Sequence, residues 1–214
     1  MAVPIIYGPD YSTYARTVRL ALEEKPAEYR LEPIHILGGE GQQASYLQRH
    51  PFGKVPAFEH DGFRMYETDA ITRYIDQVFP GKRLQPSDAR QAARMNQAIS
   101  IINSYGYGSI IGKVVWQRLI VPMTGGGQGD EAVVRDAKPM VTRVLGEIDR
   151  IRGNDGYLAG PEISLADLFL APIFAYLSLT PDANELLEPT RGLKRWWEEI
   201  SSRETMTKTQ PKLG

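Results

Sequence analysis

The spacing of apolar residues changes once along this chain of 214 residues, near residue 80. Up to that point, short apolar runs typical of strands alternate with helical stripes. From residue 89 onward, the three- and four-residue spacing of helices prevails. The stretch between them, GKRLQPSD at 81–88, has the polar, proline-containing composition of a linker. The sequence therefore predicts an α/β domain over residues 1–80 and an all-helical domain over residues 89–214.

The first domain contains four candidate strands. An apolar run at 3–7 precedes a helical stripe over 13–25, and a second strand is expected within YRLEPIHIL at 29–37. Two further runs, VPAFEH and FRMYE, are separated by Asp61-Gly62, which favours the positive φ angles of a two-residue hairpin turn. A parallel crossover between the first two strands, followed by this hairpin, predicts a mixed four-stranded sheet with helices on its faces.

The second domain is expected to be built around one apolar helix. Ser164 and Asp167 have the spacing of a capping box, and the helix that follows, LADLFLAPIFAYL, is apolar on nearly every side. We expect this helix to be the buried centre of the domain. A long helix is expected before it, over residues 88–120, with a bend near its three glycines at 106, 108 and 112.

Composition excludes several kinds of site. The chain has no cysteine, so disulfides, thiolate metal sites and cysteine nucleophiles are ruled out, and its three histidines lack metal-ligand spacing. A net charge of -1 provides no overall basic surface for nucleic acid. The N-terminus does not resemble a signal peptide, and no apolar run approaches the length of a membrane span. We therefore expect a cytoplasmic protein without a bound metal, a nucleic-acid partner or a membrane anchor.

Val55-Pro56 stands at the start of the third candidate strand, where a proline removes a hydrogen-bond donor from the sheet. A trans proline at a strand start explains this position without a function and is the more common arrangement. A cis bond would instead turn the N–H and C=O groups of Val55 outward, where they could pair with an extended, peptide-like ligand.

Glu67 and Thr68 lie where the hairpin meets the next helix. Free N–H groups and the positive end of the helix dipole favour a carboxylate there, and the Thr68 hydroxyl adds a donor. Glu67 can accept a hydrogen bond from an ammonium group, so the pair suits the α-amino-acid end of a ligand. An ordinary helix cap explains the same two residues without a ligand.

The stretch YGPDYSTYAR at 7–16 carries five hydroxyl groups where the first strand gives way to the first helix. A hydroxyl of Ser12 or Thr13, together with the helix dipole, would stabilise a bound thiolate and lower the pKa of the thiol. Helix capping alone also explains both residues. Arg16 and Arg19, further along the helix, are expected on a solvated face.

Three blocks of the chain together resemble the cytosolic glutathione transferases, and the first two look most like the phi-type, serine-using members and their bacterial relatives. The blocks are YGPDYSTYARTVRLALEE, HPFGKVPAFEHDGFRMYETDAITRYI and GYLAGPEISLADLFLAPIF. The resemblance implies a thioredoxin-like N-terminal domain that binds glutathione. It also implies a helical C-terminal domain that helps to hold a hydrophobic electrophile. Glutathione is then a co-substrate, and no cofactor is implied.

The resemblance assigns the sulfur-binding role to Ser12, which matches the serine whose hydroxyl binds the glutathione thiolate. Val55 matches the residue whose backbone pairs with the cysteinyl part of glutathione, and Pro56 matches the cis-proline. Tyr7 lies near the position where other classes carry a catalytic tyrosine, but in those classes the spacing between that tyrosine and the following helix differs by about one residue. Tyr7 is therefore expected to be a core residue at the end of the strand, with Thr13 as a further alternative to Ser12.

The two ends of glutathione are also assigned by the resemblance. Glu67 and Thr68 match the pair that holds the γ-glutamyl group, where Thr68 replaces the more usual serine. Lys54 is a candidate contact for the glycyl end. Gly41-Gln42 replaces the His-Lys pair of phi-type members, which weakens the expected grip on the glycyl carboxylate unless Gln42 supplies a neutral donor.

The electrophile is expected in a pocket lined by aromatic and apolar side chains from the loop after the first strand and from the long helix. The candidates are Tyr11, Tyr105, Tyr107, Ile111 and Trp116. A position in the helix core explains Ile111 and Trp116 equally well. Tyr105 and Tyr107 are the stronger candidates because the glycine between them leaves room beside the rings.

The resulting hypothesis is a glutathione transferase that conjugates the thiolate to small hydrophobic electrophiles. Peroxide reduction or isomerisation with the same thiolate is one alternative, and a non-catalytic glutathione-binding or scaffold protein is another. The resemblance further implies a homodimer, for which Phe52 and the Met65-Tyr66 edge are candidate contacts.

Overall fold

The computed structural model describes residues 2–212, which form two compact units. The first unit contains the described residues up to Gln85 together with the segment that begins at Ser202, and the second runs from Pro86 to Ser201. The sequence placed everything after residue 88 in the helical domain. That prediction is wrong for residues 202–212, which return to the first unit, and residues 213–214 lie outside the described part of the chain.

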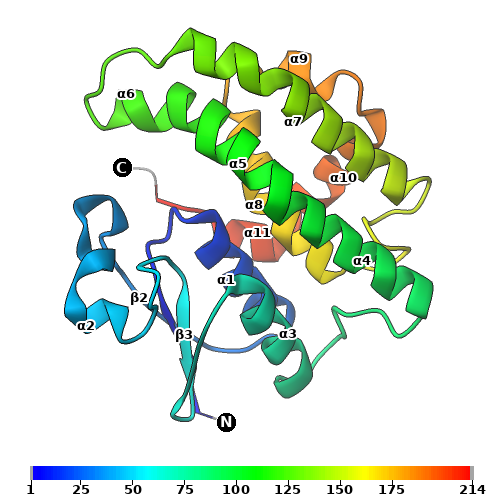
Figure 1. Cartoon of the computed structure of the whole chain (residues 1–214). Helices are drawn as coiled ribbons and strands as arrows, with labels where there is room; N and C mark the ends of the chain where they lie inside the picture. Colours follow the sequence, from blue (N-terminus) through cyan, green and yellow to red (C-terminus); the bar gives the residue numbers. More distant parts are fainter. Residues whose placement is uncertain (1, 213–214) are drawn as a thin grey trace. The chain divides into compact units, whose positions relative to one another are not determined.

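The first unit has the predicted mixed four-stranded sheet, in the order β2-β1-β3-β4. The strands are β1 (Ile5–Tyr7), β2 (Arg30–Glu32), β3 (Ala57–His60) and β4 (Phe63–Tyr66). β1 pairs in parallel with β2 and antiparallel with β3, which in turn forms a hairpin with β4 (Figure 1). This is a thioredoxin-like arrangement, because a helical crossover joins the parallel pair and a hairpin completes the sheet.

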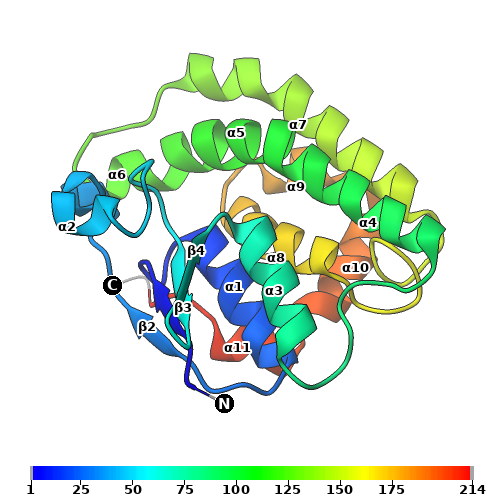
Figure 2. The same cartoon turned by 60° about the horizontal axis from the view of Figure 1, so that its bottom comes forward.

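Helices cover both faces of this sheet. Figure 2 shows α1 (Thr13–Glu24) and α3 (Thr68–Val78) side by side on one face, where Tyr74 of α3 contacts Phe58 of β3. Side chains alternate along a strand, so the neighbouring Ala57 faces the other way. It packs there with Tyr46 of α2 (Ala44–Leu47).

The second predicted strand is much shorter than the apolar alternation suggested. Beyond β2 the chain forms two 3-10 turns, η1 (Ile36–Gly38) and η2 (Glu40–Gln42). β2 ends at Glu32, and Gly39, which joins the two turns, has φ of 85°, a left-handed conformation that glycine adopts readily. Periodicity alone could not reveal where the strand ends, because Ile34 beyond it is buried just as a strand residue would be.

Arg16 and Arg19 of α1 are buried, and the prediction of a solvated face is wrong. The covering segment contains α11 (Glu204–Lys208), which lies against α1 (Figure 1). Backbone carbonyls of this segment accept hydrogen bonds from both guanidinium groups. Since any sequence supplies carbonyl groups, no residue pattern could have marked these partners.

A buried ion pair connects the end of α1 with α3. Lys25 Nζ lies 2.7 Å from Asp76 Oδ1, and both side chains are almost completely buried. Asp76 also accepts hydrogen bonds from the backbone N–H groups of Leu84 and Gln85 and from the Gln85 amide. Burial by itself would raise the pKa of Asp76. The Lys25 contact and the hydrogen bonds from the Leu84 N–H and the Gln85 amide outweigh burial and hold this pKa below its usual range.

This ion pair predicts an acid-sensitive contribution to stability. The folded pKa of Asp76 is lowered, so its contribution is complete above the ordinary aspartate pKa of about 4 and is lost as pH falls through the lower folded value. At neutral pH, Asp76→Asn leaves Lys25 charged and buried and should lower the free energy of unfolding by about 3 kcal/mol. Urea unfolding from neutral to acidic pH should show this difference shrinking. A difference that stays constant down to the lowest pH would contradict the interpretation.

All secondary-structure elements of the second unit are helices. One continuous helical run comprises α4 (Ala89–Ile101), α5 (Tyr107–Ser109) and α6 (Val121–Met123), joined by π-helical stretches at Ile102–Gly106 and Ile110–Ile120. It lies along α7 (Glu131–Arg152), as both views show (Figures 1 and 2). Gly106 faces Val144 of α7 in this contact. Gly106 and Gly112 thus fall in π-helical stretches of a helical run that extends beyond residue 120.

Helix α8 (Leu165–Ser178) is the buried centre of the second unit, as predicted. α4, α9 (Ala183–Leu187) and α10 (Arg191–Ser201) pack around it. The capping box is also present, because Ser164 and Asp167 exchange hydrogen bonds between side chain and backbone. Among the described residues, no helix is both long and apolar enough to cross a membrane.

Candidate active site

Three chain segments meet at one end of the sheet. Tyr7 pairs with Ala57, and Ala57 pairs with Tyr66, so the residues just beyond this row are Gly8, Pro56 and Glu67. Neighbouring strands lie about 5 Å apart, which brings the three segments within reach of one small ligand. The register of the sheet therefore brings together the segments that contain Ser12, Val55 and Glu67.

Gly8 allows two of these segments to approach each other closely. A Cβ at Gly8 would stand 3.2 Å from the Cβ of Ala15 and 3.4 Å from that of Val55. The first turn of α1 and the Val55 loop therefore lie on either side of this glycine. A larger residue would push them apart.

Ser12 is the N-cap of α1 and is half-buried. Its Oγ accepts a hydrogen bond from the Ala15 N–H at 3.3 Å, and within residues 2–212 it donates none to another protein group. The hydroxyl proton is therefore available to a ligand at the positive end of the helix. Capping and ligand binding, which the sequence left as alternatives, are compatible in this geometry.

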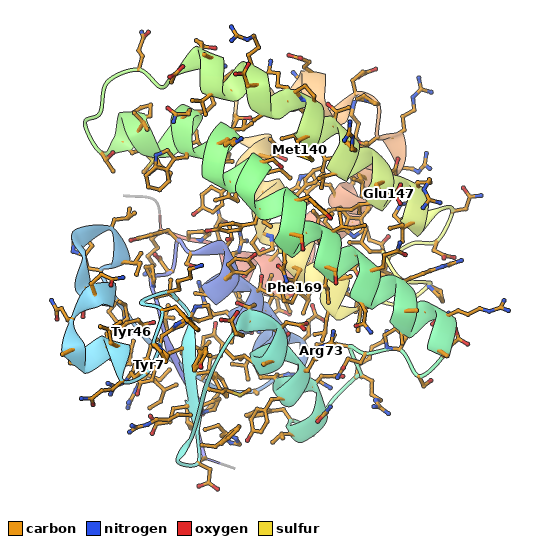
Figure 3. The ribbon with its side chains drawn as sticks, viewed as in Figure 1. Tyr7, Tyr46, Arg73, Met140, Glu147 and Phe169 are labelled. Atoms are coloured by element: carbon orange, nitrogen blue, oxygen red, sulfur yellow. The ribbon has the colours of Figure 1, made fainter. Side chains whose placement is uncertain are left out.

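The neighbouring hydroxyl groups are placed differently. Thr13 is buried in the first turn of α1. The Tyr7 hydroxyl lies 3.5 Å from Glu59 Oε2, and the guanidinium of Arg49 stands over the Tyr7 ring at 4.6 Å. Tyr7 and Tyr46 lie close together between α2 and the sheet, where both join one apolar cluster (Figure 3). Tyr7 is thus a residue at the end of the strand that packs in the core.

The Val55-Pro56 peptide bond is cis. The sequence had left cis and trans as alternatives, and cis is the less common of the two. Among the described residues, neither the N–H nor the C=O of Val55 forms a hydrogen bond with another protein group. The preceding carbonyl, of Lys54, accepts a 2.7 Å hydrogen bond from the Tyr46 hydroxyl. Burial raises the pKa of Tyr46 to about 12, so this donor keeps its proton throughout the physiological range.

Glu67 has a strained backbone at the N-terminus of α3. Its φ of 72° lies in the left-handed region, which is uncommon for residues other than glycine. Such conformations cost about 1–3 kcal/mol and cluster at functional sites. The Glu67 side chain is exposed, whereas Thr68 is buried as the first residue of the helix.

Gln42 and Lys54 lie on the same rim as Val55. The Gln42 amide packs against Gly53, where it would collide with any added Cβ, and Gly53 directly precedes Lys54. Both side chains are exposed. Gln42 is therefore in a position to offer its amide to a ligand that lies along the Val55 segment.

His50 is a residue that the sequence analysis did not assign to this site. It is buried, its ring lies 4.9 Å from that of Tyr66, and within the described residues its Nδ1 has no hydrogen-bond partner. Burial lowers the pKa of His50. The Glu67 charge opposes this shift and the Lys54 charge adds to it. His50 thus lies within electrostatic reach of two predicted site residues and favours the neutral form.

Comparison with known proteins gives matches to both halves of the chain. Family models match residues 6–83 as "Glutathione S-transferase, N-terminal domain" and residues 108–204 as "Glutathione S-transferase, C-terminal domain". Glutathione S-transferase F7 of Arabidopsis thaliana is 31% identical over 205 residues, which cover 95% of this chain and 97% of that protein. The chain belongs to the glutathione S-transferase family.

Solved structures of glutathione S-transferases share the fold closely. The crystal structure of glutathione transferase F7 from Populus trichocarpa is 30% identical, with a TM-score of 0.86 and 97% of each chain covered. Glutathione S-transferase I from maize, in complex with an atrazine glutathione conjugate, is 28% identical with a TM-score of 0.84. That match covers 97% of this chain and 96% of the maize chain. The family and fold inferred from the three sequence blocks are thereby confirmed.

In this glutathione S-transferase chain, the residues predicted to contact an electrophile divide between the two units. Tyr11 belongs to the first unit, and burial raises the pKa of its hydroxyl. Tyr107 begins α5, and Ile111 and Trp116 follow it at intervals of four and five residues in the π-helical stretch Ile110–Ile120. All three are at least partly accessible.

Trp116 and Tyr105 are exposed by 41% and 57%, so neither is a core residue. The core of this helical run is formed instead by Ile110, Val114 and Val115. Of the two interpretations given for Trp116, the helix-core one is wrong. Among residues 2–212, no group of three His, Asp or Glu side chains is arranged to hold a metal ion.

Proposed function

We propose that this chain conjugates the thiolate of glutathione to small hydrophobic electrophiles. One observation supports this function best. Three segments meet at one end of the sheet, and each offers hydrogen-bonding groups to a ligand: the Ser12 hydroxyl, the Val55 backbone and the Glu67–Thr68 helix start. Together they match the sulfur, the cysteinyl backbone and the γ-glutamyl end of one glutathione molecule.

In this proposal the Ser12 hydroxyl donates a hydrogen bond to the glutathione sulfur and keeps its proton. The thiolate form is favoured by this hydrogen bond and by the N-terminus of α1, so the pKa of the bound thiol falls. The thiolate attacks the electrophilic carbon, a C–S bond forms, and a leaving group such as chloride departs with the electrons of its bond. The thiol proton goes to solvent, and no covalent bond to the enzyme forms.

The remaining contacts hold glutathione in register with Ser12. Val55 pairs through its free N–H and C=O with the cysteinyl backbone, as in strand addition. Glu67 accepts from the γ-glutamyl ammonium, and Thr68 and the free N–H groups of α3 bind the adjacent carboxylate. Lys54 and Gln42 contact the glycyl carboxylate, one with a charge and the other with a neutral donor.

The electrophile in this proposal contacts Tyr11, Tyr105, Tyr107, Ile111 and Trp116. We further propose a cytoplasmic homodimer that detoxifies such compounds without any bound cofactor. Phe52 is 65% exposed, and its ring stacks edge-on to His50 and Tyr66, so it can insert into a second copy. Light scattering should give the mass of a dimer, and a monomer would contradict this part.

Two measurements on the purified protein test the function. The first is the affinity for glutathione by calorimetry, and the second is the rate of conjugation to a chlorodinitrobenzene. Binding with conjugation supports the proposal. Binding without any turnover would favour a non-catalytic protein, and peroxide or isomerisation turnover with poor conjugation would favour the other use of the thiolate.

Glu67 provides a prediction that separates binding from stability. Both Glu67→Ala and Glu67→Gly remove the carboxylate, so each should raise the Kd for glutathione about tenfold. Only glycine accepts a φ of 72° without strain, so Glu67→Gly should also stabilise the fold by about 1 kcal/mol. Calorimetry and thermal unfolding of the two variants check both effects. Unchanged glutathione affinity in both would remove Glu67 from the site.

A further inference from the structure

The segment that begins at Ser202 packs against α1, and both views show α11 beside this helix (Figures 1 and 2). At the C-terminal end of α1, Arg203 forms a bidentate ion pair with Glu24, and Thr205 donates to the same carboxylate at 2.7 Å. We call residues 202–212 the C-terminal clasp.

Arg16 and Arg19 form the middle of this contact. Arg16 donates through Nη2 to the Met206 carbonyl at 3.0 Å and through Nε to the Thr209 hydroxyl at 3.3 Å. Arg19 donates to the carbonyls of Thr209 and Lys208 at 3.1 and 3.3 Å. Both arginine residues are more than nine-tenths buried, so these acceptors replace water that the charges would otherwise require.

The clasp also reaches both sides of Ser12. Two residues before Ser12, the Asp10 carboxylate accepts a 3.0 Å hydrogen bond from the Lys212 N–H. Four residues after Ser12, the Arg16 N–H donates to the Ser12 carbonyl at 2.9 Å, while the Arg16 side chain binds the clasp. The loop that carries the Ser12 hydroxyl is thus held between two points fixed to residues about 200 positions away in the sequence.

We propose that the C-terminal clasp sets the position of the Ser12 hydroxyl, with Asp10 and Arg16 as positioning residues that do not touch the substrate. The inference rests on the proposed function, because Ser12 must bind the thiolate for its position to matter. A hydrogen bond to a thiolate depends steeply on distance and angle. Loosening the clasp should therefore raise the pKa of the bound thiol, and a merely structural clasp would affect only stability.

Thr209 offers a precise test, because within residues 2–212 its hydrogen bonds to α1 join it only to Arg16 and Arg19. Thr209→Val keeps the shape and the backbone carbonyl but removes the acceptor of Arg16 Nε. Thr209→Ser restores that acceptor. Lys208→Ala is the matched control. Among the described residues its exposed side chain forms ion pairs only with Glu23 and Glu204, and its carbonyl still binds Arg19 in the variant.

The readout is the pKa of the glutathione thiol bound to each full-length variant, followed by the ultraviolet absorbance of the thiolate as pH is raised. Thr209→Val should raise this pKa by about half a unit to one unit, which lowers conjugation at mildly acidic pH about three- to tenfold. Thr209→Ser and Lys208→Ala should match the unsubstituted protein. Thermal unfolding is measured in parallel on every variant.

Asp10→Ala is a second, less disruptive variant. Asp10 is half-buried in a loop, and within residues 2–212 the substitution removes only the hydrogen bond from the Lys212 N–H. It should raise the thiol pKa in the same direction. If Thr209→Val and Asp10→Ala lower the melting temperature but leave the thiol pKa unchanged, the positioning role is wrong and the proposed function stands. If the unsubstituted protein does not lower the thiol pKa at all, the proposed function fails first, and this inference fails with it.

Discussion

Ser12→Ala is expected to lower kcat for conjugation about a hundredfold and to change the affinity for glutathione only slightly. The Ser12 hydroxyl proton has no acceptor within the described protein, and Oγ sits at the N-terminus of α1. A hydrogen bond to the sulfur acts mainly on the thiolate, so its loss affects the reacting form far more than the binding of the rest of glutathione. Steady-state kinetics with a chlorodinitrobenzene, together with calorimetry of glutathione binding, measure the two effects separately.

The controls for this prediction come from the same turn. Ser12→Thr keeps a hydroxyl and a helix cap, so it should retain much of the rate. Thr13→Ala removes the adjacent but buried hydroxyl and should leave kcat nearly unchanged. Ser12→Ala also removes the cap on the Ala15 N–H, which costs about 1 kcal/mol of stability, so its kinetics must be recorded well below its melting temperature. A full conjugation rate in Ser12→Ala would move the assignment to Thr13, Tyr7 or Tyr11.

Asp167→Ala is expected to destabilise the second unit by about 4–5 kcal/mol. This completely buried carboxylate accepts hydrogen bonds from the N–H groups of Leu158 and Ser164, from the Ser164 hydroxyl and from Trp196 Nε1, all between 2.8 and 2.9 Å. Alanine would leave these donors buried without an acceptor. Urea unfolding followed by tryptophan fluorescence measures the loss.

Asp88→Ala provides the comparison for that prediction. Asp88 also caps a helix, accepting from the N–H groups of Arg90 and Gln91, but it is exposed. Water can take over its role, so the loss should be several times smaller than for Asp167. Equal losses for the two variants would mean that burial of the Asp167 network is not what stabilises the second unit.

Local signals in the sequence predicted the main elements of the first unit. Asp61-Gly62 marked the hairpin, and the apolar stripe from Ile71 to Phe79 marked α3, because turn chemistry and periodicity act over a few residues. The position of residues 202–212 could not be predicted in this way. It depends on buried arginines that bind backbone carbonyls far away in the sequence, and such partners have no residue signature.

The candidate site was only partly visible in the sequence. Ser12, Val55 and Glu67 could be named from the resemblance, and the sheet register explains why they converge. The strain at Glu67 and the burial of His50 were not predicted. The φ angle of Glu67 is set by the connection between β4 and α3, and the environment of His50 is set by its packing against Tyr66. Neither property depends on the residue type alone.

A crystal structure of this protein with glutathione bound tests the proposed site most directly. We expect the sulfur within hydrogen-bonding distance of Ser12 Oγ, the cysteinyl backbone paired with the N–H and C=O of Val55, and the γ-glutamyl end at Glu67 and Thr68. Glutathione bound elsewhere, or a sulfur that faces Tyr7 or Thr13 instead of Ser12, would contradict this assignment.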